Sequence, residues 1–140
     1  MTSPDPCSVV FKGSRAFSEP ETRNVRWLRD ESESIGFLID VHSHSELLLY
    51  PWGDNSSQST DPNMNFRNPA YDGLRGDRTR GYEEYIPLGD QAWLISAALD
   101  VRDAIASVRG HSYVVKPGVM LYPTSGTIKD YSYSRHFVQA

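Results

Sequence analysis

The amino-acid sequence predicts an α/β fold. Three observations predict it: an apolar run of strand length at Gly36–Val41, a helical apolar period over Asp90–Arg109, and a short strand pattern at Ser112–Val115. A strand, a helix and a strand in this order, with another helix before them, are typical of a sheet covered by helices. At 140 residues the chain has the size of one domain or of part of one.

The first element is a helix, which we expect from about Glu19 to Arg29. Ser18 suits the N-cap and Pro20 suits the first turn, while Glu21 completes the spacing of a capping box. Its apolar face is thin, so we expect it to lie on the surface of a larger structure; that face consists of Val25, Trp27 and Leu28.

The next element is the run Gly36–Val41, which is apolar almost without interruption. Such a run suits a central strand covered on both faces better than a half-exposed strand, and here it ends at His42. The later helix, Asp90–Arg109, has Gly110 placed to end it. Its apolar face is formed by Leu94, Ala98, Val101, Ile105 and Val108.

Two irregular segments complete the prediction. The residues between Tyr50 and Gly81 are rich in Asp, Asn, Ser, Pro and Gly, and a loop of this length is usually functional or disordered. Within it, Asn55-Ser56-Ser57 is a glycosylation sequon, which is a weak signal alone. A turn-rich segment, Tyr122–Thr127, leads into a last helix that we expect to begin near Thr127.

Composition excludes several function classes. The chain is 39% hydrophobic and has no apolar run near the roughly 18 residues of a membrane span, so we expect no membrane partner. A net charge of -4 gives no general basic field, so we expect no nucleic acid. The single Cys7 excludes a disulfide framework within these residues and a Cys-rich zinc module. It leaves a buried or idle thiol, or one half of a disulfide whose partner lies outside the chain.

The candidate chemistry lies after the predicted central strand. An extended backbone places Asp40, His42 and His44 on one side, and two imidazoles there can share a metal ion. The alternative is that the histidines only form hydrogen bonds near the strand end. Tyr122 lies on a turn-rich loop, where a tyrosine either swings over a cleft to bind an anionic or peptide ligand or simply packs with a hydrated hydroxyl.

Three blocks of the sequence carry a family resemblance. The specific block is IDVHSHSELLLYPWG at Ile39–Gly53, and the order and spacing of the blocks match as well. The supporting blocks are Cys7-Ser8 with Gly13 and Phe17–Thr22, and Leu121–Thr127. Together they resemble the zinc metallocarboxypeptidases of the carboxypeptidase A type. The resemblance implies a mixed, largely parallel central sheet with helices packed on both faces, and residues 1–140 as part of a single catalytic domain.

The same resemblance implies roles for three residues, and the position of His44 beside them suggests a fourth. His42 corresponds to the family's third zinc ligand and Ser43 to a serine that lines the substrate groove. His44, one position further along that face, is expected to line the groove without binding metal. Tyr122 corresponds to the mobile tyrosine that closes over the terminal carboxylate of the substrate. The implied cofactor is Zn²⁺, and the implied partners are the C-termini of peptides and proteins.

The rest of the family's site has no match in this chain. The His-x-x-Glu pair that binds zinc and the Asn-Arg pair that holds the terminal carboxylate are expected before Ser3, and the general-base glutamate after Ala140. Cys7 corresponds to a half-cystine whose partner lies upstream. A lone histidine does not hold catalytic zinc, so we expect the chain to be inactive without the remainder of the catalytic domain.

Two functions remain open at this point. The first is a fragment of a secreted zinc carboxypeptidase that hydrolyses the last peptide bond, with zinc polarising the carbonyl and activating water. The second is a non-catalytic peptide-binding module derived from the same fold. In the resembled family the floor of the specificity pocket lies a fixed distance after the mobile tyrosine. This resemblance implies that Lys129 lies at the floor, where its charge would favour acidic C-terminal residues. A turn that differs by one residue puts Ile128 there instead, leaves Lys129 to solvent or to Asp130, and favours apolar ends.

Overall fold

The α/β class is confirmed by the computed structural model, which describes residues 3–32 and 34–137. The strands pair in parallel, as expected. The chain divides into two compact units, which are described separately: Met1–Val41 with Ser125–Ala140, and His42–Thr124. The expectation that residues 1–140 belong to a single domain stays a prediction. Among the described residues, no helix is long and apolar enough to cross a membrane.

In the first unit, α1 (Pro20–Glu31) confirms the predicted first helix. The predicted capping box is wrong, because Glu19 occupies the N-cap and its side chain makes no capping hydrogen bond. The Ser18 hydroxyl instead donates to the Glu19 carboxylate at 2.8 Å. As expected, the apolar side chains of α1 are exposed; they are Val25, Trp27 and Leu28.

The last helix of this unit, α3 (Ile128–Ser132), begins where it was predicted. Thr127 is its N-cap and accepts a hydrogen bond from the Asp130 amide at 3.4 Å. The chain continues into a π-helical turn, Tyr133–Phe137. Tyr131 ties this segment to the end of α1, because its hydroxyl donates to Asp30 at 2.7 Å. The Tyr131 ring also packs edge to face against the Phe17 ring, with the ring centres 5.2 Å apart. These contacts connect the last helix to α1 and to the segment that precedes it.

The predicted central strand at Gly36–Val41 is wrong. The run is irregular in the structure, and most of its apolar side chains are exposed, with Ile39 at 62% and Val41 at 85%, whereas Leu38 is half-buried. A strand is stable when its backbone pairs with a neighbour and its apolar faces are covered. In the described ranges no strand pairs with this run, so neither condition is met. The first regular strand begins six residues later, at Leu47.

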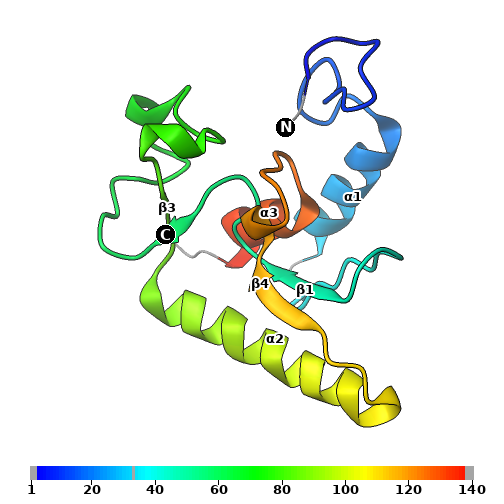
Figure 1. Ribbon diagram of the computed structural model, residues 1–140. Coiled ribbons are helices and arrows are strands. Elements are labelled where there is room, and N and C mark those ends of the chain that lie inside the picture. The colour runs from blue at the N-terminus through cyan, green and yellow to red at the C-terminus, as the bar shows by residue number, and fades with distance from the viewer. Residues whose placement is uncertain (1–2, 33, 138–140) are drawn as a thin grey trace. The chain divides into compact units, whose positions relative to one another are not determined.

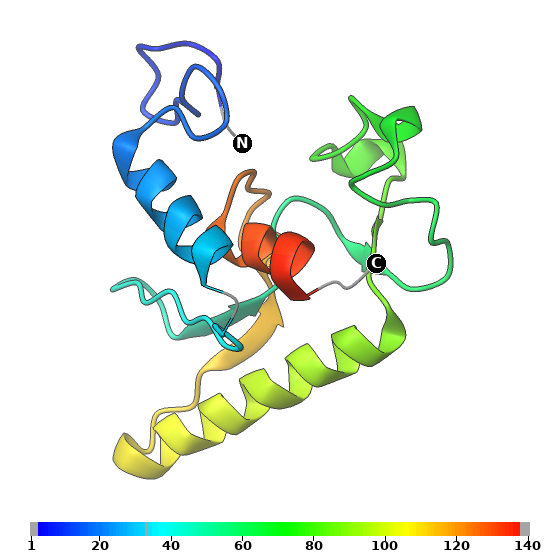
Figure 2. The ribbon, with the colours of Figure 1, turned by 180° about the vertical axis from the view of Figure 1, so that it is seen from behind.

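The second unit is built on a strand–helix–strand arrangement. β1 (Leu47–Tyr50) pairs in parallel with β4 (Val114–Pro117), with Leu47 opposite Val114. Between them in sequence lies α2 (Leu88–Arg109), which packs along both strands (Figures 1 and 2). The helix ends as predicted, since Gly110 adopts φ 73° and its amide donates to the Ala106 carbonyl at 2.7 Å.

The core of the second unit includes one residue of the segment that was expected to be an irregular loop, Trp52, and residues that follow that segment. Trp52, Tyr82, Ile86 and Val119 are buried in this core. Two short strands, β2 (Ser57–Gln58) and β3 (Glu84–Tyr85), pair in parallel and close this segment. Between them, single 3₁₀ turns at Pro69–Tyr71 and Arg78–Arg80 are capped by the side chains of Asn68 and Asp77. The abundance of Asn and Asp therefore reflects ordered turns, because these side chains satisfy nearby backbone amides.

Candidate functional site

The segment His42–His44 lies on the surface at the start of the second unit. All three side chains are exposed, and the backbone bends from Ser43 to Glu46, with Ser45 at φ 69°. The prediction that Asp40, His42 and His44 share one face of a strand is therefore wrong, because alternation of side chains requires an extended backbone. The chain turns here to enter β1, and this turn leaves His42 outside regular structure.

A complete zinc site does not fit the described residues alone. Among them, no group of three or more His, Cys, Asp or Glu side chains lies close enough together to hold a metal ion. Zinc sites in proteins use about three or four such ligands. His42 supplies at most one imidazole from this part of the chain. Cys7, whose thiol is exposed and free, forms no disulfide here, so the option of a buried thiol is wrong.

Tyr122 lies on an exposed loop that is held at both ends by backbone hydrogen bonds. The Val119 amide donates to the Trp52 carbonyl at 3.0 Å, and the Thr124 amide donates to the Gly53 carbonyl at 2.8 Å. The Thr124 hydroxyl contacts the same Gly53 carbonyl at 3.1 Å. Between these fixed points the Tyr122 side chain is 56% exposed. The end of β1 and the segment that carries Tyr122 are thus brought together by backbone hydrogen bonds.

Lys129 lies on α3 in the first unit. Its ammonium group donates to the Thr127 hydroxyl at 3.2 Å and lies 3.7 Å from the Asp130 carboxylate. Both charged side chains are largely covered, with 20% and 14% exposed. Contact with Asp130 is one of the two placements expected for Lys129 if Ile128 takes the pocket position, and the identity of the pocket residue stays a prediction.

A buried polar cluster in the second unit escaped the sequence analysis. Its centre is Glu84, which is 1% exposed. One carboxylate oxygen accepts from the Phe66 amide at 2.6 Å, and the other accepts from the Tyr82 hydroxyl at 2.8 Å. Burial raises the pKa of Glu84 to about 7, and the neighbouring charge of Asp54 adds to the rise. Burial also raises the pKa of Asp54.

Arg75 links this cluster to the turns around it. Its guanidinium donates to the carbonyls of Asn65 and Asn68 at 2.9 and 2.7 Å, and it reaches the Tyr82 hydroxyl at 3.4 Å.

The sequence contains one signal for this cluster, which is the spacing of two residues between Tyr82, Glu84 and Ile86. Burial alternates along Tyr82–Ile86, so that Tyr82, Glu84 and Ile86 are buried and Glu83 is exposed. Period-two reading of that short segment places Glu84 on the apolar face.

The sequon asparagine belongs to the interior of the same region. Asn55 is buried, and its side-chain oxygen accepts from the Gly76 amide at 3.1 Å. A buried amide that holds a backbone group is a structural residue and does not present its nitrogen to modifying enzymes. The sequon therefore gives no indication of a glycan in the folded chain.

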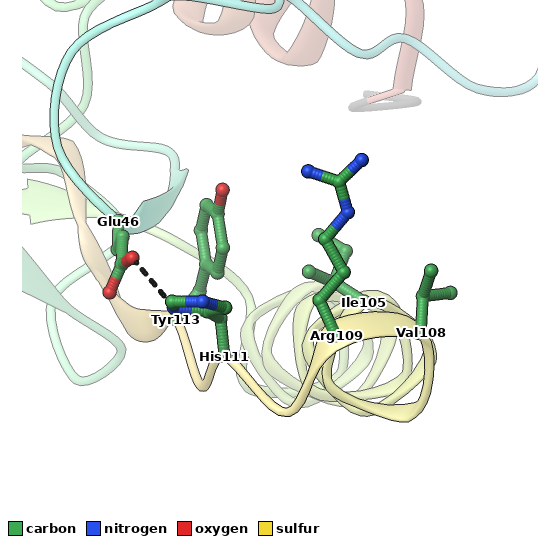
Figure 3. Close-up of a pocket in the computed structure, with 6 residues that line it drawn as sticks. All are labelled: Glu46, Ile105, Val108, Arg109, His111 and Tyr113. Atoms are coloured by element: carbon green, nitrogen blue, oxygen red, sulfur yellow. Dashed lines mark ion pairs between the residues drawn. The ribbon is translucent and has the colours of Figure 1, made fainter.

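A pocket of 410 Å³ lies at the carboxyl end of α2 (Figure 3). The His111 ring lies 3.2 Å from the Glu46 carboxylate there, and both side chains are mostly exposed, so this contact adds little stability. None of the residues proposed from the resemblance lines this pocket. Its lining residues are Glu46, Ile105, Val108, Arg109, His111 and Tyr113.

Comparison with known proteins gives a consistent result. The family model described as zinc carboxypeptidase matches residues 1–140. Carboxypeptidase A4 of Mus musculus is 30% identical over 133 residues, which cover 94% of this chain and 25% of that protein. Carboxypeptidase B of Helicoverpa zea is 42% identical over 59 residues, or 41% of this chain and 14% of that protein.

A third relative is an inactive metallocarboxypeptidase of Talaromyces marneffei, 30% identical over 91 residues, or 61% of this chain and 15% of that protein. The chain thus spans about a quarter or less of the length of these relatives. No solved structure gives a significant match.

Proposed function

The chain belongs to the zinc carboxypeptidase family, and on this premise we propose that it is part of a zinc-dependent hydrolase that removes the last residue of peptides and proteins. The observation that carries the proposal is the family match along all 140 residues. The intact protein is proposed to be secreted and to combine this segment with the remainder of its catalytic domain. Free C-termini of peptides are its proposed substrates.

His42 is the proposed zinc ligand of this segment. The exposure of its imidazole, at the bend that precedes β1, supports the proposal, because a metal ion shared with other parts of the protein requires an accessible ring. Ser43 and His44, exposed beside it, are proposed to line the substrate groove. The described residues hold no complete ligand set, so the remaining ligands are assigned to the rest of the intact protein.

The second candidate function is a non-catalytic peptide-binding module. It is favoured by the relative whose name describes an inactive metallocarboxypeptidase. Incubation of the intact protein with an N-terminally blocked peptide separates the two functions. We expect mass spectrometry to find the peptide shortened by one residue from its C-terminus. Recovery of an unchanged peptide that remains bound to the protein would favour the module instead.

Tyr122 is proposed to donate its phenol hydrogen bond to the substrate and not to act as the base. The Tyr122 side chain is exposed, and backbone hydrogen bonds hold the loop on either side of it, which supports this role. In the intact enzyme, Tyr122→Phe is expected to raise KM by about tenfold, the loss of roughly one hydrogen bond to a charged group, while kcat changes little. Steady-state kinetics on one peptide check this. Loss of kcat at unchanged KM would assign the tyrosine a different role.

The contact of Lys129 with Asp130 supports one of the two expected substrate preferences. An ammonium already neutralised by a covered carboxylate offers no net positive charge to an acidic substrate residue, so we propose that Ile128 faces the pocket. The intact enzyme is then expected to prefer Phe or Leu over Glu as the last residue by tenfold or more, about 1.4 kcal/mol. Rates on peptides that vary only at this residue give the answer. A preference for Glu would indicate that Lys129, and not Ile128, forms the floor of the pocket.

A further inference from the structure

We propose that Glu84 is a positioning residue for the Tyr122 loop, defined here as Val119–Thr124. Glu84 anchors the segment on which Trp52 packs, and Trp52 with Gly53 holds both ends of the loop. The importance of this anchor for catalysis rests on the proposed role of Tyr122, but the anchoring itself is a structural property that is testable without any activity.

The first link runs from Glu84 to the aromatic core. Its carboxylate accepts the Phe66 amide at 2.6 Å, which fixes the backbone that carries the Phe66 ring. That ring lies 5.7 Å from the Trp52 ring, centre to centre, which is within the range of favourable aromatic contact. The residue after Glu84, Tyr85, provides the carbonyl that accepts the Trp52 indole N–H at 3.2 Å. Trp52 is therefore held by two residues close to Glu84: its ring packs against Phe66, and its indole N–H donates to the Tyr85 carbonyl.

The second link runs from Trp52 to the Tyr122 loop. The backbone carbonyl of Trp52 accepts the Val119 amide, and the adjoining Gly53 carbonyl accepts the amide and hydroxyl of Thr124. These bonds join segments that lie about seventy residues apart in sequence, since the Thr124 hydroxyl bond spans 71 positions. A shift of Trp52 in its packing site moves the acceptors at both ends of the loop together.

The charges around Glu84 make this anchor sensitive to pH. Burial and the negative charge of Asp54 raise the pKa of Glu84, whereas the hydrogen bond from Tyr82 and the positive charge of Arg75 lower it. Burial is the largest effect, and the resulting pKa of Glu84 is about 7. An exposed glutamate has a pKa near 4.5. The stability that the anchor contributes is fully present below that ordinary value and is lost as the pH rises through about 7, because the ionised form is disfavoured in the buried site.

Hydrogen exchange of the intact protein tests the proposal. In Glu84→Ala, the Phe66 amide and the Tyr82 hydroxyl lose their acceptor, so protection of the Val119 and Thr124 amides is expected to fall by about tenfold or more. The Val114 amide, which donates to the Glu46 carbonyl in the β1–β4 pairing, is the internal reference and is expected to change less. Glu83→Ala is the matched control, because Glu83 is the exposed neighbour.

Glu84→Gln provides a second, conservative variant. A glutamine oxygen accepts the Phe66 amide, and its NH₂ group donates to the Tyr82 oxygen. The variant therefore imitates the protonated glutamate, whose O–H group donates to Tyr82, whereas the ionised carboxylate accepts from the Tyr82 hydroxyl. Loop protection, corrected for intrinsic exchange, is expected to remain high in Glu84→Gln and to be independent of pH. In the unmodified protein it is expected to fall between about pH 4.5 and 7.

Three outcomes overturn the proposal: unchanged loop protection in a folded Glu84→Ala, an equal loss of protection at Val114, or the same pH dependence in Glu84→Gln as in the unmodified protein. If Glu84→Ala does not fold, the glutamine variant alone decides. Where peptidase activity is present, Glu84→Ala is expected to raise KM more than it lowers kcat, as Tyr122→Phe does. Absence of peptidase activity would contradict the proposed function, but the hydrogen-exchange result would still test the anchoring of the loop by Glu84.

Discussion

Replacing His42 with alanine in the intact protein is expected to remove most of its zinc. A catalytic zinc ion is held by about three protein ligands, and losing one of them removes a coordinate bond that water does not replace with equal strength. We expect affinity to fall by at least about 100-fold, so that dialysis against metal-free buffer leaves the variant largely without metal. Elemental analysis of the protein after dialysis gives the stoichiometry directly.

The surroundings of His42 make this experiment easy to interpret. Because the side chain is exposed and lies outside regular structure, its removal does not open a cavity in a core, and the circular dichroism of the variant should match that of the unmodified protein. His44→Ala is the matched control, since His44 is exposed in the same bend and is expected to keep its zinc. Stoichiometric zinc in His42→Ala would refute the assignment.

Replacing Trp52 with alanine is expected to destabilise the chain by about 3–5 kcal/mol. The ring is 4% exposed, packs against Phe66 and donates its indole N–H to the Tyr85 carbonyl. Truncation therefore leaves a cavity and removes the donor to the partly buried Tyr85 carbonyl. Urea unfolding followed by circular dichroism measures the change in the free energy of unfolding.

Trp93→Ala is the control for this prediction, because Trp93 lies on α2 and is 54% exposed. Its replacement in the chain of residues 1–140 is expected to cost less than about 1 kcal/mol. Trp52→Phe keeps most of the buried ring and is expected to fall between the two. Equal effects of Trp52→Ala and Trp93→Ala would show that the buried segment around Trp52 is not the core of its unit.

The elements that the sequence predicted correctly are those with local signals. The end of α2 at Gly110 and the start of α3 at Thr127 depend on residues within one turn of the helix end. Gly36–Val41 was predicted as a strand because it is apolar, but strand formation depends on pairing with residues elsewhere. The apolar run alone does not supply a partner, and the described residues contain none for it.

In the candidate site, too, residues in short motifs could be predicted from the sequence, whereas burial that depends on distant contacts could not. The resemblance indicated His42 and Tyr122 from short motifs, and the structure adds that both are exposed and that the Tyr122 loop is fastened to Trp52 and Gly53. Their roles stay predictions. Burial of Glu84 was not predicted, because it depends on Phe66 and Tyr82 closing around a carboxylate that reads as a surface residue in isolation.

The most direct test of the central proposal compares two peptides that differ only at the C-terminus, one with a free carboxylate and one with a carboxamide. A carboxypeptidase recognises the terminal carboxylate, so the zinc-loaded intact protein is expected to release the last residue of the acid at a rate at least about tenfold above that of the amide. Mass spectrometry of both products over time measures this ratio. Internal cleavage, equal rates on the two peptides, or no release by folded, zinc-loaded protein would contradict the proposal.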